Sequence, residues 1–140
     1  MANVTVTSAN VRALTANGAV LLPPKHAGGT VTIGYLVYID SSGDIQHADA
    51  NVDEATARAV GIAVESFDGE TSVVSGNPVS VCVFGPVSGF SSLTPGANYY
   101  VSDDVGRISD AAATYDRIVG FAIDACTLFV HVQQNDPSSA

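Results

Sequence analysis

The residues that most often carry out chemistry in proteins are present but do not form a catalytic or metal-binding pattern. His26, His47 and His131 lie far apart in the chain, and none has the spacing of a metal-binding motif. The segment 40–44, Asp-Ser-Ser-Gly-Asp, resembles part of a calcium loop but lacks the other ligands and the terminal glutamate. Serine, glycine and aspartate together are typical of a turn, so a turn is the preferred interpretation.

Nucleophilic catalysis and phosphate binding are equally unsupported. Ser88 follows a Gly-Pro pair but does not lie in a Gly-x-Ser-x-Gly setting. No glycine-rich loop precedes a predicted helix, which is where phosphate groups are usually held. We therefore expect no enzymatic activity, no cofactor and no bound metal.

Four tyrosines leave a binding role open. Tyr35, Tyr38, Tyr99 and Tyr100 lie in predicted strands, and tyrosine rings can stack on sugars. Tyrosines at strand starts more often serve packing or interfaces with other proteins. Both interpretations stay open for Tyr99 and Tyr100.

Composition predicts a single folded domain built from strands. The chain has 140 residues, of which 46% are apolar and 14% charged, which suits a hydrophobic core and not a disordered chain. Valine and threonine recur, and glycine and proline divide the sequence into short segments. The two cysteines, Cys82 and Cys126, are too few to form a disulfide framework, and their pairing is left open.

Charge is distributed unevenly along the chain. The net charge of −9 makes nucleic-acid binding improbable, because an acidic surface repels phosphate. Residues 1–39 contain Arg12 and Lys25 but no acid, and all 14 acids lie from Asp40 onward. One interpretation is that the N-terminal segment contacts an acidic surface on another copy or a larger partner; the other is that a short polar segment lacks acids by chance. Neither a membrane span nor an export signal is expected.

One pattern of predicted strands occurs twice in the sequence, in residues 34–84 and 96–133. Each copy has a strand with tyrosine, a tight turn and an Ala- and Asp-containing stretch, followed by a strand with Gly-x-Ala and a closing alternating strand. The Gly-x-Ala strands are residues 59–65 and 118–124. A duplication of this kind predicts architecture and says little about chemistry.

Alternation along the Gly-x-Ala strands separates a bulky face from a face that is poor in side chains. The bulky faces are expected to enter the core; they are Val60, Ile62 and Val64 in the first copy and Val119, Phe121 and Ile123 in the second. The opposite faces allow another backbone to approach closely. We expect these faces to lie in a partner interface, and the candidate interface residues are Arg12, Lys25, Gly61, Ala63, Tyr99, Tyr100, Gly120 and Ala122.

These features predict an all-β fold, an antiparallel β-barrel or β-sandwich built from the duplicated unit. Residues 1–29 are expected to form an extended arm that lies on the body or on a partner. Residues 30–133 form one β domain, and residues 134–140 a loose tail. Residues 51–54 allow at most one short helix, and residues 85–96 are expected to be a loop between the copies.

The chain resembles the small decoration, or cement, proteins of tailed-bacteriophage capsids. The resemblance rests on residues 34–38 (Gly-Tyr-Leu-Val-Tyr), residues 60–63 (Val-Gly-Ile-Ala) and the alternating strand 79–83. In the second copy, residues 93–96, 99–102 and 119–122 resemble repeats found in virion surface proteins. It covers about residues 28–132.

The resemblance implies a β-rich protein bound to the outer surface of an icosahedral shell. Its expected partner is the major capsid protein, and the expected assembly is a homo-oligomer, a trimer or dimer, made in the host cytoplasm. It would stabilise the shell against internal pressure and would carry no catalytic residues. The alternative function is a glycan-binding β module of a phage tail or host-recognition fibre.

Overall fold

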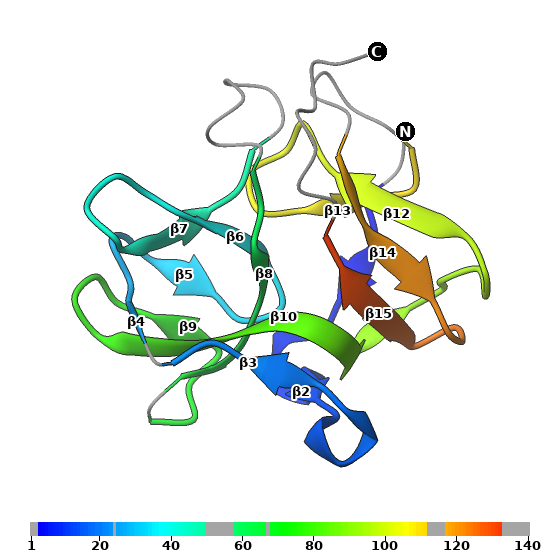
Figure 1. Ribbon diagram of the computed structural model, residues 1–140, viewed down its shortest axis with the longest axis horizontal. Helices are drawn as coiled ribbons and strands as arrows, with labels where there is room; N and C mark the ends of the chain where they lie inside the picture. Colours follow the sequence, from blue (N-terminus) through cyan, green and yellow to red (C-terminus); the bar gives the residue numbers. More distant parts are fainter. Residues whose placement is uncertain (1–2, 24, 50–57, 67, 112–116, 133–140) are drawn as a thin grey trace.

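The computed structural model of the chain has an all-β fold, as the sequence predicts (Figure 1). It describes residues 3–23, 25–49, 58–66, 68–111 and 117–132. Within these residues the only helical segments are two 3-10 turns, η1 (Ser8–Asn10) and η2 (Thr15–Asn17). The short helix predicted at residues 51–54 and the tail at residues 134–140 lie outside the described residues.

The strands of the described segments follow in chain order. They are β1 (Thr5–Val6), β2 (Arg12–Ala13), β3 (Val20–Leu21), β4 (Lys25–His26), β5 (Val31–Thr32), β6 (Leu36–Ile39), β7 (Ile45–His47), β8 (Gly61–Ser66), β9 (Ser72–Val73), β10 (Pro78–Ser88), β11 (Phe90–Ser91), β12 (Asn98–Val101), β13 (Ile108–Ser109), β14 (Ile118–Ala122) and β15 (Thr127–His131).

Strand β10 is the longest and lies at the centre of the main sheet. Its first half pairs antiparallel with β8, from Val79 to Cys82, and its second half pairs with β15, from Phe84 to Ser88. The short strands β4, β3 and β2 pair with β10 in that order along its length. Five strands therefore pair with β10.

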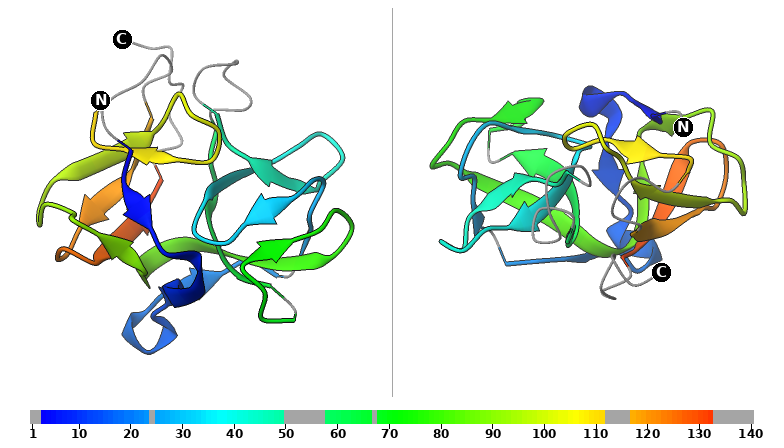
Figure 2. Two further views of the ribbon diagram at one scale, coloured as in Figure 1. Left: turned by 180° about the vertical axis from the view of Figure 1, so that it is seen from behind. Right: turned by 90° about the horizontal axis from the view of Figure 1, so that it is seen from above.

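The two sequence copies fold into the same strand arrangement on either side of β10. The sheet order is β13-β12-β14-β15-β10-β8-β6-β7. In the first copy the neighbours run β7-β6-β8-β10, and in the second they run β13-β12-β14-β15. Strands β6 to β8 of the first copy, cyan to green, lie on one side of the molecule and β12 to β15 of the second, yellow to red, on the other, and β10 crosses between them (Figures 1 and 2). The duplication seen in the sequence is thus a duplication of topology.

The two ends of this sheet curl round and meet at Gly106, in the turn between β12 and β13. The Gly106 N–H donates to the carbonyl of Ala48 at 2.6 Å, and the Leu36 N–H donates to the carbonyl of Gly106 at 2.8 Å. Gly106 has φ +73°, and a Cβ there would lie 2.5 Å from the Tyr35 ring and 3.1 Å from the His47 ring. Only glycine fits this junction, because both the backbone angle and the space exclude a side chain.

The N-terminal segment, expected as an arm, lies on the body of its own chain. β1 pairs with β11, and β2 to β4 line the edge of β10. The Asn3 backbone forms a bridge with Ser109. The segment is also held at its end, because Ala27 bridges Ile45 and the Gly28 N–H donates to the Ile45 carbonyl at 2.8 Å.

The loop predicted for residues 85–96 is wrong in its first part, because β10 continues to Ser88. Gly85 has φ +109° and lies against the backbone of Ala19, so glycine serves close packing here and not a turn. Pro86 contributes its carbonyl, which accepts a hydrogen bond from the Leu14 N–H at 2.9 Å. A Gly-Pro pair is a common turn signal, which explains the error.

His47 packs into the junction around Gly106. Its ring centroid lies 5.1 Å from that of Tyr35, and the Arg107 guanidinium lies 5.6 Å from the Tyr35 centroid. The His47 Nε2 accepts a hydrogen bond from the Thr32 N–H at 2.9 Å, which requires that nitrogen to be unprotonated. Burial lowers the pKa of His47 below its usual value of 6.5.

Replacing Gly106 by alanine should destabilise the chain far more than the same change at Gly43. Both glycines have positive φ, but a Cβ at Gly43 would meet nothing within 4 Å. We expect a loss in the free energy of unfolding of about 1 kcal/mol for Gly43→Ala and about 3 kcal/mol for Gly106→Ala. Urea denaturation measures both, and equal losses would contradict the closure at Gly106.

Protonation of His47 should destabilise the fold below neutral pH. Because the folded-state pKa lies below 6.5, the unfolded chain takes up the proton first, and stability falls as pH drops through 6.5 and below. We expect His47→Gln to lessen the loss of unfolding free energy between pH 7.5 and pH 5. Asp40 and Asp124, whose pKa values are lowered below 3.8 by hydrogen bonds, act below this range. An unaltered slope in His47→Gln would refute the assignment.

Candidate functional site

Four of the predicted interface residues are buried in the fold of their own chain. Gly61 and Gly120 are buried, and the exposed fractions of Ala63 and Ala122 are 0% and 2%. A partner cannot reach residues that are covered in this way. The expectation that these four residues contact another protein is therefore wrong.

The reason for the repeated glycine is a close approach between strands of the same chain. A Cβ at Gly61 would collide with the carbonyl oxygen of Cys82, and a Cβ at Gly120 with that of Phe129. The two contacts are equivalent, since Cys82 lies opposite Ile62 and Phe129 lies opposite Phe121. The close backbone approach predicted from the sequence is present, but its partner is β10 in one copy and β15 in the other.

The tyrosines differ from each other in position. Tyr99 is 4% exposed, and its hydroxyl accepts a hydrogen bond from the Thr94 N–H at 2.8 Å, so it anchors the loop before β12. Tyr100 is partly buried on the same strand. Neither offers a fully exposed ring.

Arg12 and Lys25 lie near opposite ends of β10. Arg12 is exposed and donates to the carbonyls of Ala9 and Val11. It pairs in register with Ser88, and Lys25 with Val79. Nine residues of strand separate these positions, which is about 30 Å. The two cations therefore do not form one site, and a contact with a shell or another copy stays a prediction for each.

Two residues of the bulky face of the second repeat, Phe121 and Ile123, are exposed, contrary to expectation, whereas Val119 is buried as expected. Phe121 is 39% exposed and Ile123 is 48% exposed. The equivalent of Phe121 in the first repeat, Ile62, is fully buried, and so is Cys82, the equivalent of Phe129. The same strand face is thus covered in one repeat and open in the other.

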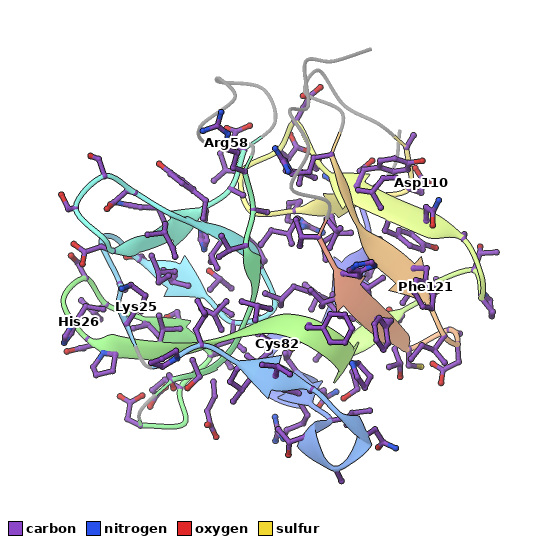
Figure 3. The ribbon with its side chains drawn as sticks, viewed as in Figure 1. Lys25, His26, Arg58, Cys82, Asp110 and Phe121 are labelled. Atoms are coloured by element: carbon purple, nitrogen blue, oxygen red, sulfur yellow. The ribbon has the colours of Figure 1, made fainter. Side chains whose placement is uncertain are left out.

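The open face carries a row of aromatic rings, here called the aromatic face, formed by Phe84, Phe121, Phe129 and His131. The rings of Phe121 and Phe129 are stacked with centroids 5.2 Å apart. Phe84 packs edge-on against Phe129 at 5.2 Å and against His131 at 5.7 Å. Figure 3 shows Phe121 on β14.

Strand register brings these rings together. Phe121 lies opposite Phe129 in the β14–β15 pair, and Phe84 lies opposite His131 in the β10–β15 pair. Residues two apart on β15 share a face, so Phe129 and His131 lie side by side. The face therefore needs β10 from the first repeat and β14 and β15 from the second.

The aromatic face is suited to contact with another molecule. It presents rings that pack on each other, and exposed aromatic clusters commonly mark interaction surfaces. Among the described residues no group of three or more His, Cys, Asp or Glu side chains is placed to hold a metal ion. Cys82 and Cys126 are both free thiols, the first buried and the second exposed.

Comparison with known proteins adds no relatives. No protein-family model matches the sequence, and no curated protein matches it. Within the described part of the chain, no helix is long and apolar enough to cross a membrane.

Phe121→Ser should cost little stability if the aromatic face is open in the isolated chain. The substitution removes one stacked pair, and we expect a loss of about 1 kcal/mol in the free energy of unfolding. Leu128→Ala, on the buried side of the neighbouring strand, should cost about 3 kcal/mol because it leaves a cavity. Denaturation of both variants checks this, and similar losses would show that Phe121 is covered in solution.

Proposed function

We propose that the chain is a structural protein of a phage virion that binds the outer surface of the capsid and stabilises the coat-protein shell. The observation that carries the proposal is the aromatic face, an apolar surface on an otherwise strongly acidic protein. The resemblance of residues 28–132 to capsid decoration proteins supports the same function. Its partner is the major capsid protein.

The proposal is consistent with the small energy available at one site. Full burial of a phenylalanine side chain is worth roughly 2 kcal/mol. Phe84 and Phe121 are 43% and 39% exposed, so covering them adds about 1 kcal/mol each. A contact of this size is weak alone and becomes effective when many copies bind a symmetric shell or act as an oligomer.

The basic residues of the N-terminal segment are a second, separate contribution. Arg12 is exposed at the edge of β10, in a segment without acids. We propose that Arg12 and Lys25 contact the shell or a neighbouring copy. Deletion of residues 2–27 would remove β1 to β4, so a loss of binding could reflect a loss of folding. Single substitutions of Arg12 and Lys25 are therefore the appropriate variants.

The double variant Phe84→Ser/Phe121→Ser should lose occupancy on capsids. The experiment mixes purified chain with capsids of its phage that lack the protein, and measures the bound fraction after sedimentation. We expect the wild-type chain to sediment with capsids and the double variant to bind at least tenfold more weakly, because the change removes both exposed rings.

The matched control is Val74→Ser/Val105→Ser, which removes two exposed apolar side chains elsewhere, 64% and 53% exposed. It should bind as the wild type does. A wild-type chain that stays in the supernatant would refute capsid binding. Equal binding by the two double variants would refute the role of the aromatic face.

A further inference from the structure

A groove on the second repeat lies apart from the aromatic face and encloses about 410 Å³. Its walls come from the N-terminal segment around β1, from β11 and the loop that follows it, and from the start of β12. Asp110, just after β13, completes the rim beside β12 (Figure 3). This volume falls within the roughly 300–1,000 Å³ of small-molecule sites and accommodates one or two sugar rings.

Polar, uncharged side chains make up most of the groove lining, beside the apolar Val4 and Ala97. Hydroxyls come from Thr5, Ser91, Ser92 and Thr94, and an amide comes from Asn98. The lining contains no lysine, arginine or histidine, and its one acidic side chain is that of Asp110. An anionic ligand would find no basic group here, and an apolar ligand would strip water from the polar groups without replacing their hydrogen bonds.

The polar groups of the loop side are available to a ligand. Ser92, Thr94 and Asn98 are exposed, and their side chains make no hydrogen bond to the described residues. Hydroxyls and amides both donate and accept, which matches the dual character of sugar hydroxyls. The lining therefore favours a neutral ligand rich in hydroxyl groups.

Both walls of the groove are held in place before any ligand binds. Two hydrogen bonds fix the loop. The Thr94 N–H donates to the Tyr99 hydroxyl at 2.8 Å, and the Gly96 N–H donates to the Ala122 carbonyl at 2.8 Å. Ser92 is the only non-glycine residue of the described chain with positive φ, at +61°. On the opposite wall, Asn3 accepts a hydrogen bond from the Ser102 hydroxyl at 2.6 Å. A rigid site loses little conformational entropy on binding.

We propose that this groove binds a neutral glycan. Thr94 and Asn98 supply hydrogen bonds to sugar hydroxyls, and the ring of Tyr99 lines the groove while its hydroxyl holds the loop. The proposal does not depend on capsid binding, since the groove and the aromatic face share no residue. A protein on a virion surface with such a groove would also adhere to sugar-coated surfaces.

The test is binding of the purified chain to an array of neutral and acidic glycans, followed by titration of the best neutral oligosaccharide by NMR. We expect saturable shifts of the amides of residues 91–98. Thr94→Val removes a hydroxyl and keeps the N–H that bonds Tyr99, and Asn98→Ala removes the amide. Each should weaken binding about tenfold.

Matched controls are Thr30→Val and Asn17→Ala, which are exposed residues outside the groove. They should bind as the wild type does, and thermal unfolding should show that all four variants are folded. Absence of binding to every neutral glycan, binding to acidic glycans alone, or unchanged binding by Thr94→Val and Asn98→Ala would each overturn the proposal. The result of the capsid sedimentation experiment does not depend on these outcomes, so the two proposals can fail separately.

Discussion

The backbone of β10 is the constraint on which the rest of the structure depends. Antiparallel strands satisfy their hydrogen bonds only through neighbours, and β10 supplies those bonds to β8, β15, β2, β3 and β4 along its eleven residues. The first repeat ends in β10, and the second repeat ends in β15, which pairs with it. Two glycines, Gly61 and Gly120, let the neighbouring strands approach at equivalent points. The sheet then closes on itself at Gly106.

Much of this architecture could be predicted from alternation and repetition. The all-β class, the two copies and strand β6 at Leu36–Ile39 follow from patterns that depend on local sequence alone. The extent of β10 could not be predicted, because Gly85 and Pro86 have the local signature of a turn. Their place in a strand is decided by Ala19 and Leu14, which are more than 60 positions away in the sequence and pack against them.

The aromatic face was missed for a different reason. Alternation groups Phe121 and Ile123 with Val119, but it does not say which side faces the core, and Val119 is buried while the other two are exposed. The equivalent face in the first repeat is covered and that in the second repeat is open, so the two copies differ in burial where they agree in topology. Phe84 and Phe129 come from strands of different repeats, and only their register brings them together. The small residues opposite predict an interface as readily as packing within the chain, because a close backbone approach has the same sequence signature whether the other strand belongs to the same chain or to a partner.

Through its pairing with β8 and β15, strand β10 makes the two repeats one cooperative unit. Native-state hydrogen exchange of the amides of β8, β14 and β15 as a function of urea tests this most directly. The account predicts that protected amides in both repeats converge on one opening free energy, equal to that of global unfolding. Two separate free energies, one for each repeat, would contradict it.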